Sequence, residues 1–168
     1  MVSSSENAGA VVMVADDDPG VRSLVSELLK SRGFAVREAP DGIVACELAE
    51  AEPPALILLD VLLPRRDGYS VLLHLRSSEA TRDIPVVLMS GESESEQAGI
   101  ARTLGAQAFL AKPFTNSKLV AAVEATVMNA PPPLVRKYGT QCLALWNKLF
   151  TFTAYIRSNC SSDTPNMG

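Results

Sequence analysis

Short apolar runs alternate with longer amphipathic stretches along the first 130 residues. The apolar runs predict buried strands at residues 11–15, 34–37, 55–59, 86–89 and 108–110. The stretches after them, where apolar residues recur every three or four positions, predict helices at residues 19–32, 42–52, 68–76, 94–104 and 117–128. Strands and helices that alternate in this way form a parallel sheet with helices on both faces. The pattern therefore predicts a doubly wound α/β fold.

Capping residues support several of these helix boundaries. Asp18 is a typical N-cap, and Pro19 suits the first helical position, where no backbone N–H is needed. Gly33 is typical of the residue that follows a helix. Asp41-Gly42 and Asp67-Gly68 stand where the second and third helices begin, so each predicted start has its own polar cap.

Four of the predicted strands run into polar residues that packing does not explain. These residues are Asp16-Asp17-Asp18, Asp60, Ser90-Gly91 and Lys112-Pro113. The carboxyl ends of parallel strands meet at one edge of the sheet, so we expect these side chains to converge there. An acidic cluster, a further Asp, a hydroxyl and a cation together indicate a divalent-metal site beside a carboxylate that can be phosphorylated.

In this order, the motifs resemble those of the receiver domain of two-component response regulators. The resemblance covers residues 9–129 and includes the stretch from Leu58 to Gly68 and the Lys112-Pro113-Phe114 motif. It implies a receiver domain at residues 10–129 with a flavodoxin-like (βα)5 fold of strand order 2-1-3-4-5. Periodicity alone does not predict that strand order. The family also implies a cis peptide bond before Pro113.

The resemblance implies a role in phosphoryl transfer for each strand-end residue. Asp60 would accept a phosphoryl group from a histidine kinase or from a phosphotransfer protein. Lys112 would balance the charge of that group, and Ser90 would donate its hydroxyl to a phosphoryl oxygen. The backbone N–H of Gly91 would make a similar contact. Such a domain catalyses only its own phosphorylation and slow dephosphorylation, so we do not expect an enzyme that turns over a separate substrate.

The same residues predict a site for Mg²⁺ or Mn²⁺. Asp17 and Asp60 fit direct metal ligands, and Asp16 fits a ligand that acts through water. The family adds the backbone carbonyl of Leu62. The three successive acids leave this assignment ambiguous, and we give the metal-binding pair to Asp16 and Asp17 because Asp18 is explained as a helix cap.

Ser90 and Phe109 occupy the switch positions of the family. When Ser90 moves toward a phosphoryl group, the ring of Phe109 can fill the vacated space, although Phe109 is also explained as a core residue of its strand. The expected output surface, formed by residues 94–104, 108–110 and 117–128, would bind a downstream protein or a second copy. Leu62 and Glu92 flank the site, and the apolar Leu62 leads us to expect moderately slow loss of the phosphoryl group.

Charge and cysteine usage limit the other possibilities. Residues 1–130 hold 11 Lys and Arg against 18 Asp and Glu, so this acidic part is not expected to bind nucleic acid. Cys46, Cys142 and Cys160 form no metal or disulfide pattern, and Cys46 fits a small core residue. Residues 1–9 are predicted to form a flexible lead and have no signal-peptide pattern, and no apolar run reaches the ~20 residues of a membrane span. We expect a cytoplasmic protein.

Composition changes at Pro131-Pro132-Pro133, and residues 130–168 are predicted to be a linker and tail. Apolar residues there recur in nearly heptad steps at Leu134, Tyr138, Cys142, Leu145, Leu149, Phe152 and Ile156. Three interpretations remain open at this point. The tail is a non-native segment without regular structure, an amphipathic helix for dimerisation or docking, or the remnant of an output domain.

Two other functions fit the sequence less well than a receiver does. An aspartate-nucleophile phosphohydrolase needs a second acid two residues after the nucleophile, where this chain has Leu62, and residues 16–20 have the spacing but end in Gly20. A scaffold-like receiver that is never phosphorylated would not need the complete set of site residues. His74, the one histidine, fits an ordinary residue of its helix.

Overall fold

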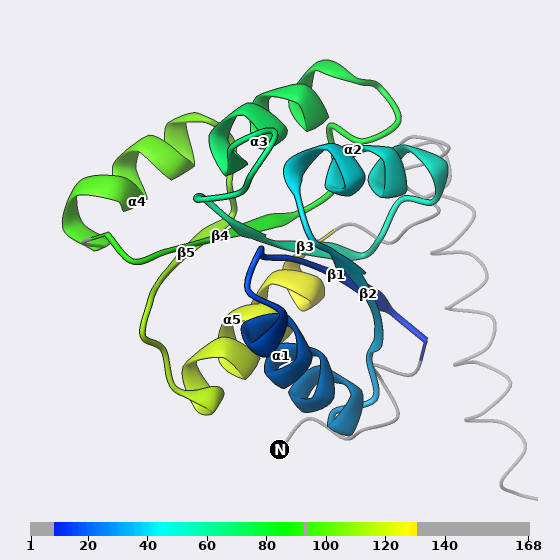
Figure 1. The fold of residues 1–168 in the computed structure, drawn as a ribbon, viewed down its shortest axis with the longest axis vertical. Coiled ribbons are helices and arrows are strands. Elements are labelled where there is room, and N and C mark those ends of the chain that lie inside the picture. Colours follow the sequence, from blue (N-terminus) through cyan, green and yellow to red (C-terminus); the bar gives the residue numbers. More distant parts are fainter. Residues whose placement is uncertain (1–8, 93, 131–168) are drawn as a thin grey trace, which may run out of the picture. The chain divides into compact units, whose positions relative to one another are not determined.

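The computed structural model describes residues 9–92 and 94–130, which form a sheet of five parallel strands and five helices (Figure 1). The strands are β1 (Val11–Ala15), β2 (Ala35–Ala39), β3 (Leu56–Asp60), β4 (Val86–Ser90) and β5 (Ala108–Ala111). The helices are α1 (Pro19–Ser31), α2 (Gly42–Ala51), α3 (Gly68–Ser77), α4 (Glu94–Thr103) and α5 (Asn116–Asn129). The strand order is β2-β1-β3-β4-β5, which confirms the predicted fold class and topology.

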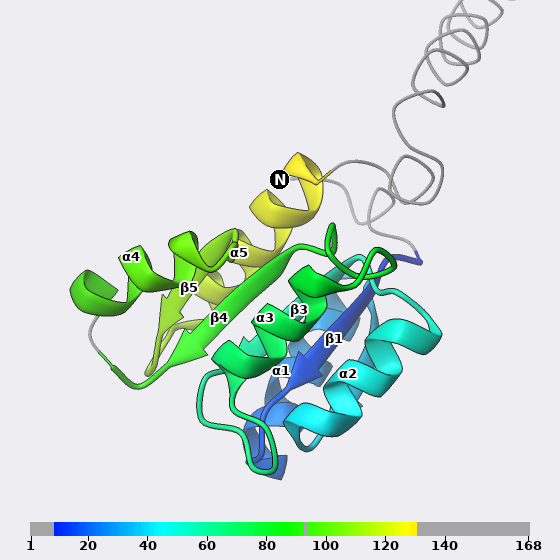
Figure 2. The ribbon, with the colours of Figure 1, turned by 90° about the horizontal axis from the view of Figure 1, so that it is seen from above.

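Helices cover both faces of the sheet. Helices α1 and α5 lie on one face, and α2, α3 and α4 lie on the other (Figures 1 and 2). Side chains of each strand alternate between the two faces, so Met13 and Ile57 pack in one hydrophobic core while Val12 and Leu58 pack in the other. A hydrophobic core on each face of the sheet thus fixes the strands whose carboxyl ends carry the polar residues.

Strands β3 and β4 lie inside the sheet, which explains why each is apolar up to its final residue. All five residues of β3 and all five of β4 are buried, because each strand has a neighbour on both sides and helices above and below. The final residue of each strand is the exception in chemistry, since Asp60 and Ser90 are polar and still buried. Buried polar side chains at two adjacent strand ends indicate a functional site.

The boundaries of β2 differ from the prediction. We expected a strand at residues 34–37, whereas β2 begins one residue later and continues to Ala39. Its register runs from Ala35 beside Val11 to Ala39 beside Ala15, so the backbone of β1 pairs with it along its whole length. Arg37 and Glu38 carry no apolar signal on this edge strand, which is why the sequence pattern ended early.

The predicted N-caps of α1, α2 and α3 are confirmed. The Oδ1 atom of Asp18 accepts hydrogen bonds from the N–H of Gly20 at 2.7 Å and of Val21 at 3.2 Å. Asp41 and Asp67 cap their helices in the same way. Such a cap is worth about 1 kcal/mol. Local hydrogen bonding therefore sets where these helices begin.

Several predictions concern residues outside the described part of the chain. The heptad-like pattern, Cys142 and Cys160 all fall within residues 131–168, and most of the predicted N-terminal lead falls within residues 1–8. Cys46 is described: it is a free cysteine buried in α2, which confirms its interpretation as a core residue. Of the described helices, none has the length and apolarity that a bilayer crossing requires.

Candidate functional site

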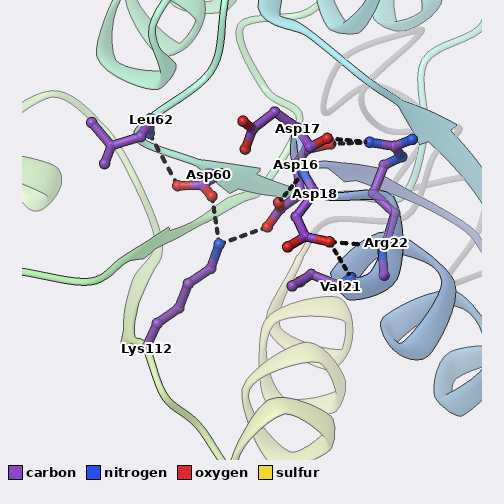
Figure 3. Close-up of polar contacts among 9 residues, drawn as sticks. Asp16, Asp17, Asp18, Val21, Arg22, Asp60, Leu62 and Lys112 are labelled. Carbon is purple, nitrogen blue, oxygen red and sulfur yellow. Dashed lines mark hydrogen bonds and ion pairs between the residues drawn. The ribbon is translucent and has the colours of Figure 1, made fainter.

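The polar residues at the strand ends converge at one edge of the sheet, as predicted. Asp16 directly follows β1, Asp60 ends the adjacent β3, Ser90 ends β4, and Lys112 directly follows β5. The side chain of Lys112 extends between the carboxylates of Asp16 and Asp60 (Figure 3). Residues that are 96 and 52 positions apart in the chain are therefore in direct contact.

The Lys112 ammonium group neutralises part of a buried acidic cluster. Its Nζ atom donates to Oδ2 of Asp16 at 2.6 Å and also to Oδ2 of Asp60. Asp16 is 1% exposed and Asp60 is 6% exposed, so neither carboxylate is well solvated. Burying a charge is costly unless it is paired and hydrogen-bonded, and Lys112 provides that pairing for both acids.

The electrostatics of the cluster keep the lysine charged. Burial alone would lower the pKa of Lys112, but hydrogen bonds and ion pairs with Asp16 and Asp60 outweigh it and raise the pKa above its usual value. Burial raises the pKa of Asp16, against the opposing effects of Lys112 and the N–H of Asp18. At the site, one cationic side chain thus lies between two buried carboxyl groups.

Three carboxylates lie close enough to hold one metal ion. One carboxylate oxygen from each of Asp16, Asp17 and Asp60 lies within 4.8 Å of the others. Oxygen ligands at about 2.1 Å from Mg²⁺ stand at most about 4.2 Å apart, so small side-chain movements would bring these atoms to ligand spacing. Hard carboxylate oxygens are the donors that Mg²⁺ and Mn²⁺ prefer. The residues present therefore fit such an ion.

The loop after Asp60 holds that side chain in a defined orientation. The N–H of Leu62 donates to Oδ1 of Asp60 at 3.0 Å, while the Leu62 side chain is 69% exposed (Figure 3). Gly68, at the start of α3, lies so close that an added Cβ would overlap the carbonyl oxygen of Asp60. Loop and helix together therefore pack directly against the candidate acceptor.

The predicted switch residues, Ser90 and Phe109, lie on the adjacent strands β4 and β5. Ser90 is fully buried, and its hydroxyl oxygen accepts a hydrogen bond from the N–H of Glu92 at 3.2 Å. Phe109 stands beside Leu88 in the sheet and packs, partly buried, against the core on the α4 side. Its core role is thus observed, and its switch role stays a prediction. Gly91 is exposed, with open space where a Cβ would stand.

Comparison with known proteins identifies the family. The family model described as the response regulator receiver domain matches residues 12–124. The chain belongs to this family. Its fold, with strand order 2-1-3-4-5, is that of the family's solved structures. Receiver domains of response regulators generally have histidine kinases as partners and are generally not classical enzymes.

Individual relatives agree with this assignment. The receiver is 38% identical over 114 residues to the DNA-binding dual master transcriptional regulator RpaA of Synechocystis, covering 68% of this chain and 47% of RpaA. It is 38% identical over 117 residues to the transcriptional regulatory protein PdtaR of Mycobacterium tuberculosis, covering 69% and 56%. The chain thus spans about half the length of these curated relatives.

A solved structure gives the same result. The receiver domain of NtrX from Brucella abortus superposes with a TM-score of 0.65 at 31% identity. The match covers 70% of this chain and 98% of the NtrX domain. The likeness therefore extends over a complete receiver domain.

The structure also shows two arginines near the receiver site that sequence reasoning missed. Arg22, on α1, donates to the backbone carbonyls of Asp16 and Asp17. Arg65, in the loop after Asp60, has a positive φ of 64°. Its Nη2 atom donates to both carboxylate oxygens of Asp41, to Oδ1 at 2.8 Å and to Oδ2 at 2.7 Å. The position of Arg22 four residues after the Asp18 cap was the one available signal, because it places the side chain on the first turn of α1.

Two further predictions, on Pro113 and on His74, can be compared with the structure. The Lys112–Pro113 peptide bond is cis, as the resemblance implies. His74 lies in α3, and its Nε2 stands 2.8 Å from Oε1 of Glu50 on α2. This contact agrees with the interpretation of His74 as an ordinary helix residue.

Proposed function

We propose that this receiver domain is a cytoplasmic phosphoryl acceptor. Asp60 receives the phosphoryl group from a histidine kinase or a phosphotransfer histidine, with Mg²⁺ or Mn²⁺ as cofactor. The observation that carries the proposal is the buried carboxylate of Asp60, held by Lys112 beside the carboxylates of Asp16 and Asp17. A buried acid at the end of an apolar strand has no packing role, whereas this set of partners suits a phosphoryl group.

In the proposed reaction, a carboxylate oxygen of Asp60 attacks the phosphorus atom of a phosphohistidine. A P–O bond forms as the P–N bond to the donor breaks, and the electron pair of that bond leaves with the imidazole nitrogen. The N–H of Leu62 keeps the carboxylate oriented through its bond to Oδ1. Holding the acceptor in a fixed geometry lowers the barrier to this bimolecular step.

The surrounding residues counter the repulsion between two anions. Asp17, Asp60 and the Leu62 carbonyl would hold Mg²⁺, with Asp16 acting through water, and the ion would then neutralise charge on both the carboxylate and the phosphoryl oxygens. Lys112 would transfer its hydrogen bond from the Asp60 carboxylate to a phosphoryl oxygen. The Ser90 hydroxyl and the Gly91 N–H would donate to the remaining oxygens.

Phosphorylation would then change the face formed by α4, β5 and α5. Movement of Ser90 toward the phosphoryl group would leave space for the ring of Phe109, which already packs against the core beside α4. A local charge would thus shift a two-state element. The altered face would bind a downstream protein or a second copy, and neither nucleic acid nor a membrane is expected as a partner of this domain.

The decisive test is incubation with acetyl phosphate and Mg²⁺, followed by intact-protein mass spectrometry. We expect wild type to gain the mass of one phosphoryl group and Asp60→Asn to gain none. Asp67→Asn is a matched control, because Asp67 lies in the same loop but caps α3 by accepting from the N–H of Ser70 at 3.0 Å. This control should be phosphorylated like wild type, and EDTA should suppress the reaction in both.

Two outcomes would contradict the proposal. Modification that persists in Asp60→Asn would place the acceptor elsewhere. A folded wild type that stays unmodified in the presence of Mg²⁺ would instead favour the scaffold-like receiver.

A further inference from the structure

Arg22 connects helix α1 to the acidic loop, residues 16–18. Its Nη1 atom donates to the backbone carbonyl of Asp16 at 2.6 Å and to that of Asp17 at 3.0 Å (Figure 3). These are the two residues whose carboxylates form the candidate metal cluster together with Asp60. One side chain therefore holds the backbone from which two of the three candidate acids project.

Arg22 makes its hydrogen bonds to the acidic loop and leaves one of its own donors without a partner among the described residues. The side chain is only 15% exposed, and its buried Nε atom has no hydrogen-bond partner among the described residues. The nearest acid is Glu38, whose Oε2 stands 3.7 Å from Nε, beyond hydrogen-bond distance. A buried donor left unpaired carries a cost, and the two loop carbonyls are the bonds that Arg22 makes in return.

Glu38 reduces the repulsion that the charge of Arg22 would exert on a bound cation. An isolated guanidinium so close to the acidic cluster would repel a divalent cation. The carboxylate of Glu38 offsets that charge, and the Ser26 hydroxyl holds Glu38 by donating to Oε1 at 2.8 Å. Arg22 can therefore supply hydrogen bonds to the acidic loop while adding little net positive charge.

A local bond completes the arrangement of the loop. The N–H of Asp18 donates to Oδ1 of Asp16 at 3.0 Å, and Lys112 donates to Oδ2 of the same carboxylate. The Asp16 side chain is thus fixed at both oxygens. No such bond to the carboxylate of Asp17 is among the described contacts, so its direction depends on the backbone that Arg22 holds.

We propose that Arg22 is a positioning residue for divalent-metal binding, with Glu38 and Ser26 as its supports. It orders the acidic loop so that the carboxylates of Asp16 and Asp17 converge on that of Asp60. The inference rests on the proposed function, because it assumes that Mg²⁺ binds at this cluster. Arg22 itself touches neither the ion nor the phosphoryl group.

The test is the Mg²⁺ dissociation constant, measured by calorimetric titration of the full chain without phosphodonor. Loss of residues that support metal ligands typically weakens binding by about tenfold or more. We expect Arg22→Gln to raise the Kd for Mg²⁺ by about tenfold, and Arg22→Lys, which keeps one donor group, to lie between that variant and wild type. Glu38→Gln should also raise the Kd, because it removes the charge that offsets Arg22.

The sign of the change separates positioning from simple electrostatics. If Arg22 acted only as a positive charge, its removal would tighten Mg²⁺ binding. A Kd for Arg22→Gln that is unchanged or lower than that of wild type would therefore overturn the inference. Arg37→Gln is the matched control: it makes the same change of charge at a residue that contacts Glu52, and it should leave the Kd unchanged.

Two further readings keep the result interpretable. Thermal unfolding of each variant reports whether the fold survives, and if Arg22→Gln does not fold, the Kd values of Arg22→Lys and Glu38→Gln decide the question. Wild type that binds no Mg²⁺ would contradict the proposed function itself. Wild type that binds Mg²⁺ with the same Kd as the folded variants would contradict only the role of Arg22.

Discussion

Leu62 serves the site with its backbone and leaves its side chain in solvent. Its N–H orients Asp60, while its isobutyl group, two residues after the proposed acceptor, is 69% exposed. An apolar side chain cannot hydrogen-bond to an attacking water molecule. The hypothesis of slow hydrolysis at this site rests on that difference in chemistry.

We expect Leu62→Asn to shorten the lifetime of the aspartyl phosphate several-fold, because the amide can orient water. The measurement is the decay of the phosphorylated form after removal of acetyl phosphate, followed by intact-protein mass spectrometry. Leu73→Asn is the control, since Leu73 is a 53% exposed leucine on α3 and should leave the decay unchanged. An unchanged lifetime in Leu62→Asn would end the hypothesis.

Asp41 is a second residue whose chemistry can be isolated. The hydrogen bond from Arg65, followed by those from the N–H groups of α2, lowers the pKa of Asp41. A carboxyl whose pKa is lower in the folded state stabilises the fold above its unfolded pKa of about 3.9. That contribution disappears as the pH falls through the lower, folded value.

Asp41→Asn should therefore weaken the acid dependence of stability. Asparagine can still cap α2 but does not titrate, so below about pH 4 the variant should lose less stability than wild type. Urea unfolding at a series of pH values measures the difference. Asp83→Asn is the control, because Asp83 lies on the surface, 3.9 Å from Arg82, and the stability of this variant should depend on pH as that of wild type does. The same dependence of the unfolding free energy on pH in all three proteins would contradict the argument.

The junction between β3 and α3 depends on the absence of a side chain. The N–H of Gly68 donates to the carbonyl of Val61 at 2.8 Å, and its Cα lies against the backbone of Asp60. Gly42, at the start of α2, lies equally close to the backbone of Arg66. The first residues of α2 and α3 thus pack against the loop that carries Leu62. Each contact requires glycine, because any Cβ would overlap a carbonyl oxygen.

Gly68→Ala should lower the free energy of unfolding by about 1–3 kcal/mol, the usual cost of forcing extra atoms into a packed region. Phosphorylation of Asp60 should slow as well, because α3 must shift away from the acceptor. The control is Gly99→Ala in α4, where nothing lies within 4 Å and alanine should stabilise the helix by about 0.5–1 kcal/mol. Denaturant unfolding measures both changes, and equal stability of the two variants would refute the packing argument.

The elements themselves were largely predictable from periodicity and capping. The strands and helices that could be compared with the prediction all exist, and differences are confined to their ends. The apolar face of α1 illustrates the limit: Val25 and Leu29 are buried as the spacing indicates, but Leu24 is 60% exposed. Periodicity places a residue on a helix face, whereas the width of the contact with the sheet decides which edge positions are covered.

Across the whole domain, the site exists because four strand ends meet. Asp16, Asp60, Ser90 and Lys112 come from strands that are joined by long helical connections, and each connection returns the chain to the same edge. The order β2-β1-β3-β4-β5 places β1 and β3 side by side, which brings Asp16 next to Asp60. Lys112 then reaches both acids from beyond β5.

Local patterns in the chain were enough to predict the alternation of strands and helices, the caps, and the polar residues that end apolar runs. These features depend on near neighbours in sequence, through backbone periodicity and short-range hydrogen bonds. Only the tertiary structure shows that Lys112 bridges two carboxylates, that Arg22 holds the acidic loop, and that Arg65 has a positive φ. Such contacts join residues on different elements, and only the packing of those elements brings their atoms within bonding distance.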